Sequence, residues 1–520
     1  MSQHNGGHPR RWLILGVLMI NLLVVVLDNT ILNVALKVLA DPVHGLGASQ
    51  GDLQWSINSY TLVFSALLFS FGVLGDRHGR KRLLIGGLAL FAIASVASAY
   101  ATDPAQLIAA RALMGLGGAA IMPVTLAIIS NVFSAAERPK AIGIWSGAVG
   151  VGVAVGPILG GLLLEHYWWG SVFLINVPIV AVGIVAVSML VPESRDPRPG
   201  RLDLVGVALS VLGLVSLVYG IIDGGDHGFG RLAPWAWTAG GVAILAIFVG
   251  WELRHPSPSL DVRLFTMPRF SAATAAIGLA FFGGMGVFFF MSFYLQLTRG
   301  LTPLRTGVLL LPFALGQLVF APRTAALVRR FGARPVVAGG LALTTLSGLG
   351  LLIVDVDTPL WLVGVIFFVQ GVGMAHIIPP AMESLMSALP RERSGIASAV
   401  SNTVRQISAA LGVAVLGAIV AAIYRGRLDQ AHLPLPAAAR TAAGESLAAA
   451  HVVAEHAGTA GAALTRVADL GFVAGMHAAA WVSAGASLLA LAVVLRWLPG
   501  RPASPVAAVD EPVPALAERR

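Results

Sequence analysis

The sequence has no cysteine and little charge, and both absences narrow what the chain can be. Without cysteine there can be no disulfide framework, no thiolate metal site and no thiol chemistry. Only 11% of the 520 residues are charged and 57% are hydrophobic, whereas a soluble domain carries charge on roughly a quarter of its residues. We therefore expect the whole chain to lie in a lipid bilayer, which excludes an ordinary globular enzyme.

Further absences exclude nucleic-acid binding and ATP as the energy source. The net charge is +9, but the basic residues stand in short clusters between apolar runs, and blocks of Lys and Arg interleaved with aromatic residues are missing. The sequence has no Gly-x-x-x-x-Gly-Lys phosphate loop. No residue pattern indicates a cofactor or a metal, so we expect neither.

Long apolar runs, each closed by charge, proline or glycine, are abundant. A bilayer crossing takes about 20 apolar residues, and the predicted spans are 12–36, 54–75, 83–101, 106–132, 141–164, 171–191, 203–222, 235–253, 268–297, 303–322, 335–354, 359–386, 396–423 and 471–495. The first run lacks a small-residue cleavage site, so we expect a retained helix and not a signal peptide. The sequence thus predicts an all-α polytopic membrane protein with fourteen transmembrane helices.

The distribution of Lys and Arg between the loops predicts the orientation. When alternate loops are assigned to opposite sides, the set that holds both termini carries 24 Lys and Arg, and the other set carries 7. We therefore expect both termini in the cytoplasm and the protein in the cytoplasmic (inner) membrane. One long Ala-rich loop outside, 424–470, is expected to hold at most short helices and no domain-sized core.

The loop between the second and third spans carries a signature. Residues 72–82 read Gly-Val-Leu-Gly-Asp-Arg-His-Gly-Arg-Lys-Arg, and residues 329–334 read Arg-Arg-Phe-Gly-Ala-Arg, a weaker echo that suggests two homologous halves. The first loop resembles the signature of the major facilitator superfamily. The resemblance implies a gating motif made of Gly72, Asp76, Arg77, Gly79, Arg80 and Lys81. Small residues there let helices approach, and Asp76 can meet a basic partner or a helix N-terminus. A charged turn without further role is the alternative.

Other motifs resemble the fourteen-helix drug:proton antiporters of that superfamily. They lie at 27–36 (Leu-Asp-Asn-Thr-Ile-Leu-Asn-Val-Ala-Leu), 152–161, 173–178 (Phe-Leu-Ile-Asn-Val-Pro) and 395–406. Arg111, followed by Gly115, Gly117 and Gly118, resembles the basic fourth-helix motif of the superfamily. Two positions depart from the pattern, because Lys37 stands where the family usually has proline and Met114 where it often has glutamine.

The resemblance implies a domain organisation. Two six-helix bundles would occupy 1–191 and 268–498, the second including loop 424–470. Two linking helices would lie within 192–267, and a cytoplasmic tail would follow at 499–520. Transport would then occur by rocking of one bundle against the other around a central cavity.

Span five combines regularly spaced glycines with a proline. Gly152, Gly156 and Gly160 recur at i, i+4 and i+8, so one face of the helix has no side chains and another helix can lie against it. Pro157 and Gly161 complete what resembles the antiporter motif of exporters. A generic packing face is the alternative. The antiporter interpretation predicts that Gly156→Leu abolishes transport without preventing insertion.

Asp28 and Arg111 are ionisable residues inside predicted spans and are our candidates for proton coupling. Asp28 lies about 16 residues into span one, roughly 24 Å along the axis, which predicts the outer half of the membrane. An aspartate in a half-dry cavity can bind and release a proton, because burial favours its neutral form and a nearby cation its charged form. Arginine stays protonated, so Arg111 would tune a carboxylate or order water. A water-facing Asp28 and a structural ion pair for Arg111 are the alternatives, and whether the two residues touch is left open.

Polar residues in other spans are candidates for lining a substrate cavity. Asn402, Arg405 and Gln406 fall at i, i+3 and i+4, a polar stripe that is costly to expose to lipid. The remaining candidates are Asn33, Tyr60, Tyr294 and Gln296. A structural role for the stripe is the alternative. Because Asp28 is nearly alone as an acid within the spans, we expect a neutral, zwitterionic or monocationic lipophilic substrate.

Together these features predict a monomeric exporter of small lipophilic drugs or antibiotics that exchanges them for protons. A potential of roughly 150 mV supplies about 3.4 kcal/mol per proton, which sustains a gradient of about a few hundredfold. A dedicated exporter of one endogenous metabolite fits the same residues. A proton-coupled peptide importer would be expected to carry Glu-x-x-Glu-Arg in its first helix, and span one has no Glu. A receptor without transport would be expected to carry a soluble signalling domain.

Overall fold

The computed structural model describes residues 8–134, 137–195, 203–255, 260, 262–388 and 394–499. Each of the fourteen predicted spans has helix at its position. The helices are α1 (Arg11–Ala40), α2 (Gln50–His78), α3 (Arg80–Ala99), α4 (Pro104–Val132), α5 (Arg138–His166), α6 (Ser171–Leu174) continued by α7 (Asn176–Leu190), α8 (Leu204–His227), α9 (Leu232–Arg254), α10 (Pro268–Phe293), α11 (Pro303–Phe331), α12 (Ala333–Gly350), α13 (Leu360–Met386), α14 (Ser394–Gln430) and α17 (Gly461–Trp497). These ranges contain no strand, which confirms the all-α fold.

The helices have the length and composition of membrane spans. Twelve are long and apolar enough to cross a bilayer, and α2 is a thirteenth if its two segments, bent by 53°, count as one span. The remaining helix, α5, has 29 residues. On α9 only 17% of the most apolar stretch is buried in protein, as expected for a helix that otherwise faces lipid.

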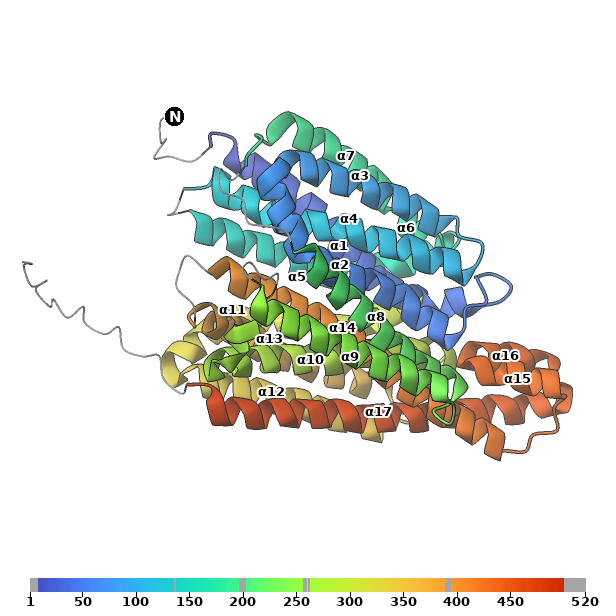
Figure 1. Ribbon diagram of the computed structural model, residues 1–520. Helices are drawn as coiled ribbons and strands as arrows, with labels where there is room; N and C mark the ends of the chain where they lie inside the picture. Colours follow the sequence, from blue (N-terminus) through green and yellow to red (C-terminus); the bar gives the residue numbers. More distant parts are fainter. Residues whose placement is uncertain are drawn as a thin grey trace, which may run out of the picture.

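The helices form two six-helix bundles, α1–α7 and α10–α14 with α17 (Figure 1). In the first bundle, α2 and α3 pack on α4, and α1 packs on α5. In the second, α11 and α12 pack on α13, and α10 packs on α14. The same pairwise order recurs in both halves, as the echo of the loop signature suggested.

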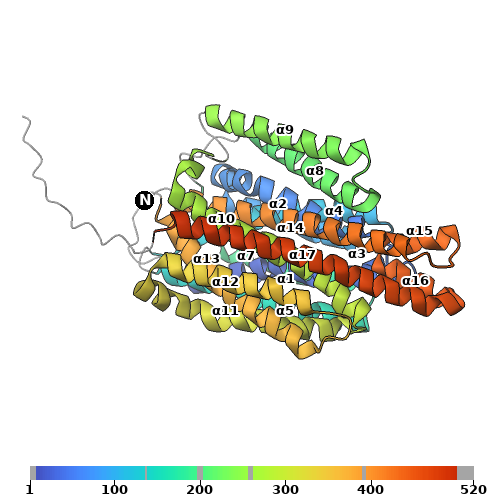
Figure 2. The same cartoon turned by 90° about the horizontal axis from the view of Figure 1, so that it is seen from below.

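The inserted helices α8 and α9 lie outside both bundles. They pack on each other, and α8 also packs on α2 of the first bundle and α14 of the second, with α9 outermost (Figure 2). A small apolar cluster joins α2, α8 and α14. It consists of Leu62, Leu214, Val218, Ile222, Ala410 and Ala414. The inserted pair is therefore attached to the side where α2 meets α14.

The two ends of the molecule differ in charge. We call the end that carries Arg11, Arg80, Arg334 and Arg496 the basic end and the other the opposite end. At the opposite end, α15 (Ala437–Glu445) and α16 (Leu447–His456) fold within 424–470. Short helices were predicted there, but α14 and α17 extend well beyond 396–423 and 471–495. The apolar runs end earlier than the helices because good helix formers, such as Arg and Gln in 424–430 and Ala in 461–470, continue a helix without adding much hydrophobicity.

Candidate functional site

Asp28 on α1 and Arg111 on α4 form a buried ion pair. Arg111 Nη1 donates to Asp28 Oδ2, and each side chain is 1% exposed. The other carboxylate oxygen, Oδ1, accepts from Asn176 Nδ2 at 3.2 Å. Asn176 Nδ2 also lies 3.4 Å from Ser95 Oγ. Both oxygens of Asp28 therefore have a partner, and the contact that the sequence left open is present.

The positive charge of the Arg111 guanidinium is stabilised further by a carbonyl oxygen and two aromatic rings. Nε donates to the Ser56 carbonyl oxygen at 3.0 Å. The guanidinium carbon lies 4.5 Å from the Tyr60 ring centroid and 5.9 Å from that of Phe173. Such faces attract a cation most strongly where water is excluded. The site can thus hold a permanent positive charge beside one carboxylate.

Glycines of the fourth-helix motif make room for Tyr60. A Cβ atom at Gly115 would lie 2.5 Å from the Tyr60 carbonyl oxygen, and one at Gly118 would lie 2.7 Å from the Tyr60 hydroxyl. The tyrosine is 0% exposed, so it packs over Arg111 and does not line a substrate cavity in this conformation. Asp28 is likewise 2% exposed, where a half-dry cavity was expected.

Sequence reasoning gave no role to several contributors to this site, among them Ser56 and Asn176. Ser56 acts through its backbone carbonyl, so no side chain could have signalled it. Asn176 stood within the motif at 173–178 but was given no role. Its position, at the start of α7 after the break that follows α6, brings its amide onto Asp28. Motifs from spans one, four and six therefore converge on one buried pair.

The glycine face of α5 lies directly against α1. A Cβ atom at Gly152 would lie 2.8 Å from Val26 Cγ1, and one at Gly160 would lie 3.0 Å from Ile31 Cγ2. At Gly156 the Thr30 hydroxyl occupies the place of a side chain. The close approach expected from the glycine spacing is present.

A second side of α5 meets the other bundle. A Cβ atom at Gly161 would lie 2.5 Å from Leu304 Cα, and one at Gly307 on α11 would lie 2.5 Å from the Pro157 carbonyl oxygen. The two backbones are thus in direct contact near the opposite end. Gly307 was not found from the sequence, because only the tertiary structure places α11 beside α5.

Helices α1 and α10 also join the bundles near the opposite end. The Ser292 hydroxyl donates to the Asn33 carbonyl, Lys37 Nζ donates to the Gln296 carbonyl at 2.9 Å, and Gln296 Nε2 donates to the Val34 carbonyl at 3.0 Å. Asn33 and Gln296 therefore lie in an inter-bundle contact. Lys37, which departs from the family pattern, supplies one of the hydrogen bonds between the bundles.

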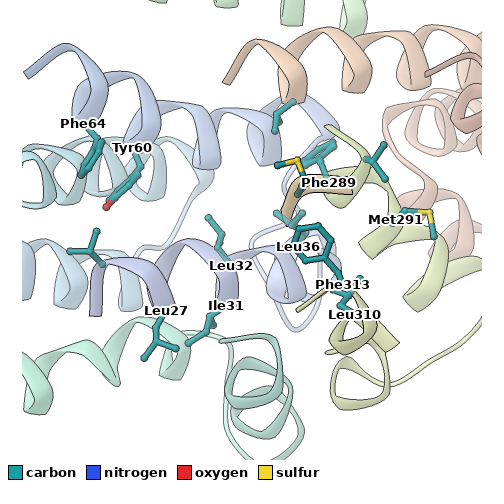
Figure 3. Close-up of a cluster of buried hydrophobic side chains, with 14 of the residues drawn as sticks. Leu27, Ile31, Leu32, Leu36, Tyr60, Phe64, Phe289, Met291, Leu310 and Phe313 are labelled. Carbon is teal, nitrogen blue, oxygen red and sulfur yellow. The ribbon is translucent and has the colours of Figure 1, made fainter. Parts of the chain in front are cut away.

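Apolar side chains extend this contact. Figure 3 shows Leu36 of α1 beside Phe289 and Phe313 of the second bundle. The polar and apolar contacts all lie in the last turns of α1 before Ala40. The two bundles are thus closed against each other at the opposite end.

The polar stripe on α14 lies on the side of the second bundle that faces the first. Arg405 Nη2 donates to Asn402 Oδ1 at 2.7 Å, and its guanidinium carbon lies 5.3 Å from the Phe281 ring centroid. Phe281 shares a face of α10 with Ser292, which meets α1. Asn402, Arg405 and Gln406 are all half-buried.

Tyr294 has a different environment. It is 0% exposed, and its hydroxyl donates to the Asp355 carbonyl at 2.7 Å. Arg299 Nη1 lies 3.4 Å from the same hydroxyl. These contacts are within the second bundle, so we leave Tyr294 out of the proposed cavity.

The loop signature forms the turn between α2 and α3. Arg80 Nε donates to Asp76 Oδ1 at 2.9 Å, so Asp76 meets a basic partner. The N-terminus of α3 is capped instead by Glu193, which accepts from the backbone N–H groups of Lys81 at 3.1 Å and Arg82 at 3.3 Å. This cap was missed, because Glu193 lies 112 residues from Lys81 along the chain.

Glycine is required at the centre of this turn. Gly79 has φ +114°, and a Cβ atom there would lie 2.7 Å from Glu193 Oε1. In the echo between α11 and α12, Gly332 occupies the same place with φ +89°. Gly72 is half-buried on α2, Arg77 is exposed, and Lys81 Nζ donates to the Ser188 carbonyl at 2.7 Å.

Sequence comparison relates this chain to known transporters. A profile of the Major Facilitator Superfamily matches residues 18–413. The chain is 36% identical over 486 residues to the multidrug efflux pump LfrA of Mycolicibacterium smegmatis, covering 93% of this chain and 96% of that protein. It is 32% identical over 503 residues to the tetracenomycin C resistance and export protein of Streptomyces glaucescens, covering 94% and 92%. It is 34% identical over 496 residues to the methyl viologen resistance protein SmvA of Salmonella typhimurium, covering 93% and 97%.

Solved structures show the same fold. A bacterial homolog of the human lysosomal transporter Spinster, inward-facing and unoccupied, aligns with a TM-score of 0.66 at 18% identity, covering 95% of this chain and all 100% of that one. A peptide transporter POT in complex with sulfate aligns with a TM-score of 0.63 at 16% identity, covering 94% and 95%. With its paired bundles and inserted helices, the chain belongs to the Major Facilitator Superfamily and is a multi-pass membrane transporter, not an enzyme.

Proposed function

We propose that the protein is a proton-coupled antiporter that exports small lipophilic drugs or antibiotics by alternating access. The observation that carries the proposal is the buried pair of Asp28 and Arg111, where motifs of three spans converge. Relatives named as efflux and resistance pumps support drug export. The 24 to 7 distribution of basic residues supports cytoplasmic termini, which makes the basic end cytoplasmic.

Asp28 is the proposed proton carrier. In the closed pair its charge is balanced by Arg111 and its second oxygen is held by Asn176. Proton binding would neutralise the carboxylate, and Arg111 would then be a cation without an anionic partner. Arg111 would keep its bond to the Ser56 carbonyl and its contact with the Tyr60 ring. The charge balance of the site therefore differs between the two protonation states, as coupling requires.

Helix α1 connects the proton site to the contacts between bundles. Asp28 lies about two and a half turns, or roughly 14 Å, from Lys37 on the same helix, and Lys37 bonds the second bundle. The glycine face of α5 lies on the intervening residues of α1, at Thr30 and Ile31. A change in the pairing of Asp28 can thus shift a helix that holds the opposite end closed.

The conformation described here is proposed to face the cytoplasm, since the bundles are closed at the end assigned to the outside. Substrate would enter from the basic end and lie between the bundles. It would contact the half-buried stripe of Asn402, Arg405 and Gln406 and the Phe281 ring. A flat aromatic substrate could stack on these groups. We propose a neutral, zwitterionic or monocationic substrate, a monomeric protein, and the domain division 1–191, 192–267, 268–498 and 499–520.

The test is drug uptake into inverted membrane vesicles. We expect uptake to require an inside-acid pH gradient and to stop when an uncoupler collapses it. Asp28→Asn should abolish this dependence, whereas Glu165→Gln, which changes an exposed acid at the opposite end of α5, should not. Undiminished uptake after the gradients are collapsed would overturn proton coupling.

Export of a single endogenous metabolite is the second candidate. One relative is named for resistance to and export of one compound, tetracenomycin C. A substrate panel in a host that lacks its own efflux pumps distinguishes the two candidates. Protection against several unrelated lipophilic compounds supports multidrug export, and protection against one supports a dedicated exporter.

A further inference from the structure

Helices α2, α8 and α14 meet in very close contact near the opposite end. The carboxylate of Asp226 on α8 lies directly against Gly51 on α2, where no side chain would fit. One residue earlier on α8, a Cβ atom at Gly225 would lie 2.6 Å from Ala418 Cβ on α14. Helix α8 therefore touches one helix of each bundle with adjacent residues.

The interface between α2 and α14, which α8 covers and which we call the α2–α14 seam, buries polar groups that have no hydrogen-bond partner among the described residues. Gln54 and Asn58 lie at i and i+4 on α2, and both are 0% exposed. Neither end of either amide has a hydrogen-bond partner among the described residues. Gln54 is pressed against α14, where a Cβ atom at Gly417 would lie 2.7 Å from its Cδ. Burying unpaired amides costs free energy, which the apolar cluster between α2, α8 and α14 and further interactions must offset to hold this seam shut.

Charges on α8 and α14 supply such an interaction. The cation that faces Asp226 is Arg425 on α14, whose buried Nη2 has no hydrogen-bond partner among the described residues; the two charges are near enough to attract but form no direct ion pair. Its carboxylate also lies at the first turn of α2, which begins at Gln50, where the helix dipole favours an anion. The other charged groups around this pair are Asp52 on α2, Asp223 and His227 on α8, and Asp429 on α14.

We propose that α8 acts as a latch, that is, a helix that bridges α2 and α14 and holds the seam between them closed. Asp226 is the residue that positions this helix. It attracts the start of α2 on one side and Arg425 on the other, and so holds a helix of each bundle in place. The second seam, between α5 and α11, lies on the far side from α8 and α9 (Figure 2). The inserted helices would thus act in gating as well as linking the bundles. This inference rests on the proposed function only in assigning the opposite end to the outside.

The absence of cysteine allows a direct test with one introduced thiol. Asn58→Cys places the thiol in the seam, and a membrane-impermeant maleimide is added to the face that carries α15 and α16. In this background, Asp226→Asn should raise the labelling rate roughly fivefold, the factor that corresponds to about 1 kcal/mol. Arg425→Gln should do the same, and the two together should do no more than either alone.

The matched control is Asp223→Asn. Asp223 lies one turn earlier on α8 and bonds His227 Nδ1 at 2.9 Å, and its loss should leave labelling unchanged. If Asp226→Asn is not recovered in the membrane, Gly225→Ala provides a second variant. Its methyl group would push α8 away from Ala418 and should also accelerate labelling.

Unchanged labelling in the Arg425→Gln and Gly225→Ala variants, both present in the membrane, would overturn the latch. A response of Asp223→Asn equal to that of Asp226→Asn would overturn the role of Asp226. Labelling needs neither substrate nor a proton gradient, so these outcomes are independent of the transport assay. Loss of proton coupling with an intact labelling response would therefore overturn the proposed function and leave the latch supported.

Discussion

Replacing Asp28 by asparagine is the most informative change to this protein, because it leaves Arg111 as a buried cation without its carboxylate. Arg111 is 0% exposed, and its remaining partners are the Ser56 carbonyl, Met114 Sδ and the rings of Tyr60 and Phe173. Removing one member of a buried pair costs about 3–5 kcal/mol. We expect a loss of about 3 kcal/mol, at the low end, since the asparagine oxygen can still accept from Arg111.

The double variant Asp28→Asn/Arg111→Gln removes both charges and separates stability from coupling. Without an unpaired charge it should recover much of the free energy of unfolding, with an interaction energy of up to about 3 kcal/mol in the double-mutant cycle. Denaturant unfolding in mixed micelles measures the free energies, and uptake driven by a pH gradient in proteoliposomes measures coupling. We expect the double variant to be stable and uncoupled.

Two results would refute this reasoning. An unfolding free energy of Asp28→Asn equal to that of the unchanged protein would show that the pair does not carry the predicted electrostatic energy. A double variant that is stable and still driven by a pH gradient would show that the pair is structural and that protons bind elsewhere.

The other predictions concern the close contacts. Gly156→Leu should insert normally but not transport, since its side chain would collide with Thr30; full uptake activity would contradict this. Gly307→Ala should weaken closure of the opposite end, because its methyl group would lie 2.5 Å from the Pro157 carbonyl; faster thiol labelling at a nearby introduced cysteine measures it, and an unchanged rate would count against it. Glu193→Gln should lower the free energy of unfolding by about 1 kcal/mol through loss of the charged cap on α3, and a stability within error of the unchanged protein would exclude that role.

Much of the fold was predictable because a bilayer makes helix formation a local property. Within lipid every backbone group must bond inside its own segment, so an apolar run of sufficient length is itself a helix prediction. A helix was located at each of the fourteen predicted positions in this way, and the paired halves followed from the loop signature and its echo. The prediction failed at helix ends that leave the apolar region. Span seven was ended at 222, whereas α8 continues to His227, so Asp223 and Asp226 were not recognised as helical.

The sequence by itself determined the membrane class, the positions of the long helices and the presence of Asp28, Arg111 and the glycines of α5, because these depend on composition and on spacing within single helices. Only the tertiary structure decided which residues meet. Asp28 and Arg111 are 83 positions apart, and Glu193 caps a helix 112 positions away. The tertiary structure also placed Tyr60 over Arg111, and it directed the Tyr294 side chain toward contacts within the second bundle. Periodicity defines the faces of one helix, but the partner of a face depends on how separate helices pack, and that is a property of the whole chain.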